Sequence, residues 1–159
     1  KAKSYLNCGL FGEQLQSLSP DWIIISLGTN EAYTKNYHRK KFKQNLTSLI
    51  QKIRNNTDSC WILLNTPGDA LHRGEARNPN NQLVQQDIIK VAKAMNCSYW
   101  DFFAVMGGEH SVDSWYSSEL TAKDKLHLNK KGYLLKANLF FDAFLNSFQP
   151  FFISKVHKK

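Results

Sequence analysis

DWIIISLGTNE, residues 21–31, is the most informative stretch of the sequence. It opens with an apolar run that follows Ser-Pro and ends at a glycine, a pattern typical of a strand buried on both faces of a parallel sheet. The run WILL, residues 61–64, follows a turn-prone segment and predicts a second such strand. Residues 99–103 are a weaker third candidate. The sequence therefore predicts a small parallel sheet with its polar residues at the strand ends.

Three segments between and after these runs have the periodicity of amphipathic helices: residues 37–54, 82–95 and 131–148. In the first, apolar residues recur at spacings of three and four, which places them on one helix face. These residues are Phe42, Leu46, Leu49, Ile50 and Ile53. The second carries a similar stripe, made of Val84, Ile88, Val91 and Met95. In the last helix we expect the phenylalanines to form the buried face, namely Phe140, Phe141, Phe144 and Phe148.

Strands that alternate with amphipathic helices predict a single α/β domain of parallel strands joined by crossover helices. Three strands are few for a self-sufficient sheet of this kind, so we expect the sheet to lack a strand in this chain. Residues 65–80 and 106–118 are predicted as long loops that follow strands. Open α/β sheets bind ligands beyond the carboxyl ends of their strands, and these loops are expected there.

Composition excludes several classes of protein. The 159 residues are 42% hydrophobic and 13% aromatic, which argues against intrinsic disorder. No apolar run approaches the ~20 residues of a membrane-spanning helix. The net charge is +8, but the basic residues are spread out and not interleaved with aromatic residues, so we expect a lysine-rich solvated surface and no nucleic-acid partner.

The three cysteines, Cys8, Cys60 and Cys97, are an odd number at wide spacings. Disulfide frameworks and zinc sites both use paired, closely spaced cysteines, so neither is expected here. We interpret Cys60 and Cys97 as small buried side chains, and the sequence leaves their redox state open. No metal and no cofactor is expected.

Three short clusters could carry chemistry. Asn30 follows the first strand, where its side-chain amide is suited to stabilising an oxyanion. Asp124 precedes His127 by three residues, and its carboxylate can accept the imidazole Nδ1–H, which leaves Nε2 free to act as a base. Gly9 and Gly12 allow backbone N–H groups to approach a ligand. Each cluster taken alone also fits an ordinary turn or helix start.

Taken in order, these motifs resemble the SGNH (GDSL-like) hydrolase superfamily. The most specific pieces are Gly-Thr-Asn-Glu-Ala at 28–32 and Asp-x-x-His-x-x-x-x-Gly-Tyr at 124–133. With Thr-Pro-Gly-Asp-Ala at 66–70, they are similar to bacterial SGNH esterases that remove O-acetyl groups from peptidoglycan. The resemblance covers residues 9–148. It implies a three-layer α/β/α, flavodoxin-like domain over 1–159, without its first strand.

The resemblance also implies roles for individual residues. Asp124 would orient His127, which would act as general base and then as general acid. The Asn30 side chain and the Gly12 backbone N–H would be the two oxyanion donors. The chain departs from the family pattern at Phe11, where the family usually has asparagine before the glycine, and at Gly68, where it usually has a second proline.

Three further residues are candidate substrate contacts. Trp115, in the predicted loop 106–118, could stack on a sugar ring. His72 and Arg73, in the loop that follows the second strand, could line the substrate cleft. The expected substrate is an O-acetylated saccharide or another small ester, and the resemblance implies a periplasmic or secreted location.

The nucleophile expected by the resemblance is missing. The superfamily serine lies in a Gly-Asp-Ser motif, whereas the only Gly-Asp here, Gly68-Asp69, is followed by Ala70. We expect this chain to be the C-terminal portion of a longer hydrolase, with the serine upstream and a carbohydrate-binding-like domain inserted between the two parts. The alternative is a pseudoenzyme that uses the same cleft only to bind carbohydrate.

Overall fold

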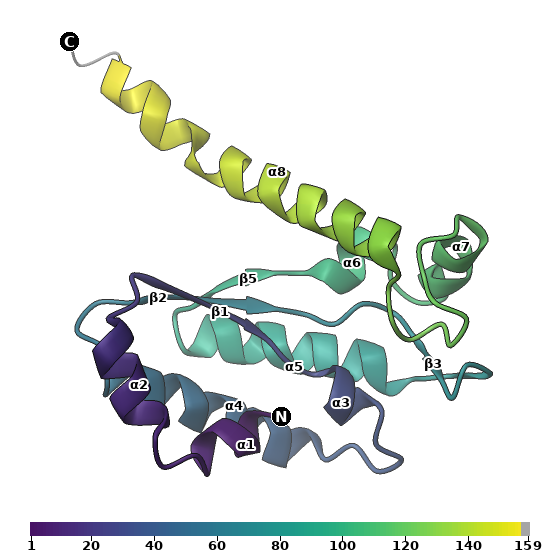
Figure 1. The fold of residues 1–159 in the computed structure, drawn as a ribbon, viewed down its shortest axis with the longest axis horizontal. Helices are drawn as coiled ribbons and strands as arrows, with labels where there is room; N and C mark the ends of the chain where they lie inside the picture. The colour runs from purple at the N-terminus through teal and green to yellow at the C-terminus, as the bar shows by residue number, and fades with distance from the viewer. Residues whose placement is uncertain (157–159) are drawn as a thin grey trace.

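The computed structural model describes the backbone of residues 1–156 and the side chains of residues 1–147. Its centre is a parallel sheet in the order β1 (Trp22–Ser26), β2 (Trp61–Asn65), β5 (Ser98–Trp100). The register pairs Trp22 with Trp61 and Asn65 with Trp100. Helices lie on both faces of this sheet (Figure 1). The prediction of a layered α/β/α domain with a parallel sheet is confirmed.

One face of the sheet is covered by α4 (Arg39–Arg54) and α5 (Asn80–Ala94). The five apolar residues predicted for the face of α4 are all buried, and so are Val84, Ile88 and Val91 of α5. They share one core with Ile25, Ile62 and Leu64 of the sheet. Two short helices, α1 (Ala2–Leu6) and α2 (Phe11–Leu18), lie on this same side, and Leu15 joins the core.

On the other face lies a single long helix, α8 (Lys130–Val156). Its Phe140 and Phe144 stack on Trp22, with ring centroids 6.4 Å and 4.9 Å away. The expectation of a fully buried phenylalanine face is wrong, because Phe141 is 57% exposed and Phe140 is only half-buried. The sheet has only three strands in the described residues, so its surface is too narrow to cover the whole phenylalanine face of α8. Phe148 lies outside the described side chains.

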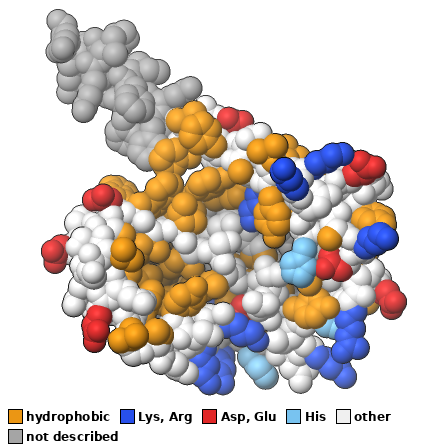
Figure 2. Space-filling view, in the orientation of Figure 1, with side chains coloured by type: hydrophobic (Ala, Val, Ile, Leu, Met, Phe, Trp, Pro, Cys, Tyr) orange, Lys and Arg blue, Asp and Glu red, His pale blue; other side chains and the backbone are white. Residues whose placement is uncertain are grey.

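The prediction that the first strand is buried on both faces is also wrong. β1 is an edge strand, paired with β2 on one side only. Its Ile25 is buried in the core, but Ile24, which points to the α8 side, is 46% exposed. Figure 2 shows hydrophobic side chains gathered on this face of the molecule, between α8 and the helices of the opposite layer.

The segments predicted as loops contain more regular structure than expected. Residues 65–80 include a small antiparallel hairpin, β3 (Leu71–His72) and β4 (Ala76–Arg77). Residues 106–118 include α7 (Ser111–Ser117). The third strand ends at Trp100, and α6 (Phe102–Met106) follows it directly. A helical turn, α3 (Thr29–Ala32), follows β1.

All three cysteines are free. Cys8 is exposed, and the expectation of buried side chains at Cys60 and Cys97 is only partly met, since both are half-buried. Burial raises the pKa of both thiols, so they are protonated at neutral pH. Among the described residues, no helix is apolar over the length that a membrane crossing needs.

Candidate active site

Asp124 and His127 form a hydrogen-bonded pair in the segment between α7 and α8. The imidazole Nδ1 lies 2.7 Å from Asp124 Oδ2. The other carboxylate oxygen, Oδ1, accepts the backbone N–H groups of Leu126 and His127, each at 3.0 Å. These bonds lower the pKa of Asp124 to about 2, and the bond to the imidazole makes the largest contribution. An ionised Asp124 accepts the Nδ1–H, which places the free lone pair on Nε2.

The pair is open to solvent, because the His127 side chain is 63% exposed and that of Asp124 is 48% exposed. Among the hydrogen bonds of the described residues, none reaches His127 Nε2. With its tautomer fixed by an ionised Asp124, the neutral imidazole can act as a base at Nε2.

Asn30 lies on α3, at the carboxyl end of β1. The chain turns sharply here at Gly28, whose φ is +119°, and a Cβ at this position would lie 2.7 Å from Val84. Only glycine combines this backbone conformation with so close an approach to α5. Asn30 is exposed, and its amide makes no hydrogen bond to another described residue. Its N–H groups are thus available to an oxyanion.

The β3–β4 hairpin lies between the Asn30 turn and the His127 segment. Tyr33, directly after α3, has its ring centroid 4.6 Å from that of His72, and its hydroxyl accepts the backbone N–H of Arg73 at 3.1 Å. On the other side, Gly74 packs against the backbone of Asp124. The structure thus brings His72 and Arg73 next to both parts of the site. No sequence motif pointed to Tyr33.

The segment that carries His127 is anchored by charged residues. These residues were not among the candidates from the sequence. Lys125 Nζ lies 3.4 Å from Asp113 Oδ1 of α7 and 4.6 Å from the centroid of the Tyr116 ring. Arg77 of β4 contacts the other oxygen of Asp113. These two cations lower the pKa of Asp113, and the hydrogen bond from Arg77 makes the largest contribution. The hairpin, α7 and the His127 segment are therefore linked through one carboxylate.

Gly12 is not at this site. It lies in the first turn of α2, where a Cβ would come within 2.8 Å of Asn56 Oδ1, just past the end of α4. α2 and α3 lie at opposite ends of β1 (Figure 1). Gly12 thus provides close helix packing, and the structure does not support its predicted role as an oxyanion donor.

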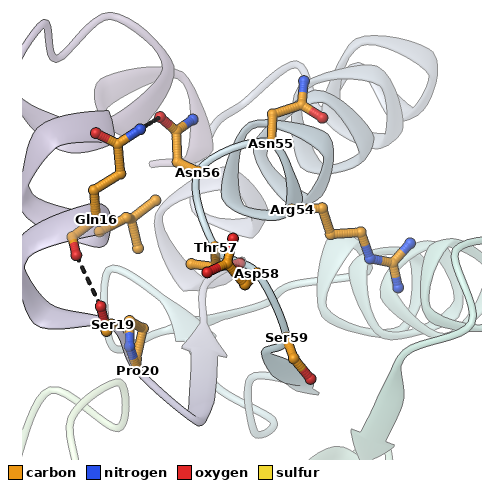
Figure 3. A pocket seen from close by; sticks show the side chains of 10 residues that line it. Gln16, Ser19, Pro20, Arg54, Asn55, Asn56, Thr57, Asp58 and Ser59 are labelled. Carbon is orange, nitrogen blue, oxygen red and sulfur yellow. Dashed lines mark hydrogen bonds between the residues drawn. The ribbon is translucent and has the colours of Figure 1, made fainter.

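The end of the sheet at which Gly12 lies, opposite to Asn30, holds a pocket of about 550 Å³. This pocket lies between the C-terminal ends of α2 and α4. Gln16, Arg54 and Asn56 contribute to its lining, and Gln16 donates to Asn56 at 3.4 Å (Figure 3). No histidine lines it. This pocket is therefore separate from the Asp124–His127 pair.

Trp115 is a core residue. It is 8% exposed, its indole N–H donates to the Met106 carbonyl at 3.0 Å, and its ring packs edge-on against Phe102 at 5.7 Å. The structure therefore places Trp115 in the core and does not support its predicted role of stacking on a sugar. The sequence pattern placed it in a loop, whereas it lies on the inner face of α7.

Comparison with known families shows which family the chain belongs to. The family model of the GDSL-like lipases and acylhydrolases matches residues 5–135. The chain belongs to this family. Its match covers the Asn30 turn and the Asp124–His127 pair, and the resemblance inferred from the motifs is confirmed. None of the curated proteins matches the chain.

Several solved structures of esterases share the fold of this GDSL-like chain. A peptidoglycan O-acetylesterase aligns with a TM-score of 0.82 and 26% identity, over 87% of this chain and 41% of its own. An acetylxylan esterase from Geobacillus stearothermophilus aligns at 0.69 and 17%, over 89% and 66%. A lipase/acylhydrolase from Enterococcus faecalis aligns at 0.63 and 24%, over 82% and 64%. This chain thus spans less than two thirds of each of these proteins.

Proposed function

We propose that the intact protein is a serine esterase that removes O-acetyl groups from a saccharide, with peptidoglycan as the substrate. The observation that carries this proposal is the 2.7 Å hydrogen bond from His127 to an ionised Asp124. This pair lies at the carboxyl end of the sheet, as does the unbonded amide of Asn30. A base with a fixed tautomer and an oxyanion donor are two of the three parts of an acyl-transfer site. Membership of an acylhydrolase family supports the same chemistry.

The third part, the serine, is assigned to a segment upstream of residue 1. The free edge of β1 offers a place for it, because a parallel strand paired there would end beside Asn30. Chain topology supports the same place. α4 joins β1 to β2 across one face of the sheet, and α2, which precedes β1, packs on that same face. Because such crossovers are right-handed, a strand that precedes α2 would lie on the side of β1 away from β2, at its free edge.

In the proposed reaction His127 Nε2 removes the serine proton as the hydroxyl attacks the acetyl carbonyl carbon. The carbonyl oxygen becomes an oxyanion, to which the Asn30 amide donates a hydrogen bond. His127 then gives its proton to the departing sugar hydroxyl, leaving an acetyl-serine. Water attacks this ester in the same way and releases acetate. Asp124 stabilises the imidazolium and stays ionised throughout.

The substrate class is proposed from similarity and charge. The chain is 26% identical to a peptidoglycan O-acetylesterase. A net charge of +8 suits an acidic polymer. A peptidoglycan substrate entails a periplasmic or secreted location. This chain spans 41% of the esterase chain. We therefore also assign a carbohydrate-binding-like domain to the whole protein of which this chain is a part.

Acetate release by the whole protein tests this proposal. O-acetylated peptidoglycan, acetylxylan and de-O-acetylated peptidoglycan are compared as substrates, with His127→Gln as the control variant. We expect acetate release fastest from the O-acetylated peptidoglycan and almost none with His127→Gln. A folded wild-type protein that binds these polymers but releases no acetate would refute the proposal and leave a carbohydrate-binding pseudoenzyme.

A further inference from the structure

The helical turn that carries Asn30 is held by side chains from outside it. A four-residue helix is too short to be stable alone, and its last carbonyl groups have no partners within the helix. Here the carbonyl of Ala32 accepts hydrogen bonds from Asn78 Nδ2 and Asn80 Nδ2, both at 3.1 Å. Asn80 Nδ2 also donates to the carbonyl of Thr34 at 3.1 Å. Two amides at the start of α5 thus cap α3.

The next residue along, Asn81, connects this cap to a second loop of the site. It is 3% exposed, and its Nδ2 donates to the Ala70 carbonyl at 2.7 Å and to Asp69 Oδ1 at 3.2 Å. Its Oδ1 accepts from Asn78 at 3.2 Å. The other oxygen of Asp69 accepts the N–H of Val112, at the start of α7, at 3.2 Å. The bonds therefore run without a break from α3 to α7.

We propose that the Asn-Pro-Asn-Asn segment at 78–81 positions the two halves of the active site relative to each other. Asn80 fixes the turn that presents Asn30. Asn81 and Asp69 fix α7, which holds the His127 segment through Asp113 and Lys125. For the catalytic meaning of Asn30 and His127, this inference rests on the proposed function. These asparagines are positioning residues, because their amides bind backbone carbonyls of the protein.

The chemistry of the contact explains why asparagine is needed at position 80. Its Nδ2 carries two N–H groups, and the contact uses one for each carbonyl. Aspartate has the same shape but no donor at neutral pH, and it would place negative charge against two carbonyl oxygens. Asn80→Asp should therefore release the turn while leaving the shape of the side chain unchanged. Gln82→Glu is the matched control, since Gln82 is exposed on the same helix and undergoes the same change from amide to acid.

Amide hydrogen exchange and steady-state kinetics on the whole protein test the proposal together. In Asn80→Asp we expect the amides of residues 31–34 to exchange about 10-fold to 100-fold faster, while those of β1 and β2 are unchanged. On an acetyl ester, kcat should fall about tenfold with KM within about twofold, because the donor is misplaced and substrate binding is retained. Gln82→Glu should match the wild type in both measurements.

Two outcomes would overturn the proposal: unchanged exchange at 31–34, or faster exchange there with wild-type kcat. If Asn80→Asp loses protection throughout the sheet, Asn80→Ala serves instead, because it removes both donors without adding charge and favours the helix. A wild-type protein without esterase activity would refute the proposed function, and the exchange data would still decide whether Asn80 holds the turn.

Discussion

The backbone N–H of Leu71 donates a 3.0 Å hydrogen bond to the carbonyl of Lys125. This bond ties the β3–β4 hairpin to the segment that carries Asp124 and His127. Because Tyr33 contacts the other side of the same hairpin, the Asn30 turn and the His127 segment share one support. The site is therefore built on tertiary contacts between loops that are far apart in the sequence.

Asp124→Asn should lower kcat by as much as about 10⁴-fold, because a neutral amide does not fix the imidazole tautomer or stabilise the imidazolium. Steady-state hydrolysis of an acetyl ester by the whole protein measures this. The KM should change little, since Asp124 contacts His127 and the backbone. A kcat within about tenfold of the wild type would contradict the assigned role of Asp124.

The lowered pKa of Asp124 predicts a pH dependence of stability. Its pKa is about 2 in the folded protein and about 3.9 in an unfolded chain. The ionised form therefore stabilises the fold above pH 4, and this contribution is lost as the pH falls from about 4 to 2. Urea unfolding of the wild type and of Asp124→Asn between pH 6 and 2 should show a difference that shrinks over this window. A difference independent of pH would contradict the assignment.

Asn30→Ala should lower kcat by about 10²-fold to 10³-fold, because the oxyanion loses a side-chain donor. Stability should be unaffected, since the Asn30 side chain is exposed and unbonded among the described residues. The midpoint of thermal unfolding serves as the control. A defect confined to KM would instead assign Asn30 to substrate binding.

Asp113→Asn should lower kcat by roughly threefold to tenfold, because it weakens the anchor of Lys125 and lets the His127 segment move. Glu119→Gln is the matched control: it breaks the exposed Lys131–Glu119 pair, a contact of 3.0 Å, and exposed ion pairs contribute little. We expect Glu119→Gln to leave kcat unchanged. Equal losses in both variants would show that the Asp113 contact has no special effect on the site.

Trp115→Phe should lower the free energy of unfolding by about 1–3 kcal/mol, because a buried N–H···O bond and packed volume are lost. It should leave the KM for acetylated saccharides unchanged. Chemical denaturation and saturation kinetics give the two quantities. A raised KM without loss of stability would return Trp115 to the substrate cleft.

Sequence patterns predicted what depends on local periodicity. The apolar stripe of α4 and the runs of β1 and β2 follow directly from side-chain spacing. The helix after β5 was missed because residues 99–103 are rich in aromatic side chains, which also suit a strand. Its signal was present in Asp101, whose side chain accepts the Ala104 N–H as an N-cap, and in Gly107 at the C-terminal end.

The rest of the site could not be predicted because it depends on tertiary contacts. The spacing of Asp124 and His127 suffices for their hydrogen bond, so that pair was predictable. Trp115 was placed in a predicted loop, and only its contact with Phe102 shows that it faces the core. In the same way, only the approach of Gly12 to Asn56 shows that this glycine packs between helices. Asn78 and Asn80 could not be identified from the sequence, since their partners are the backbone carbonyls of Ala32 and Thr34, 46 to 48 residues away.

Whether a serine upstream of residue 1 is the nucleophile can be decided by labelling the whole protein with a fluorophosphonate and mapping the labelled peptide. We expect one adduct, on a serine upstream of residue 1, with labelling strongly slowed in His127→Ala. An adduct on a serine within residues 1–159, or no adduct on a folded protein that hydrolyses acetyl esters, would contradict it.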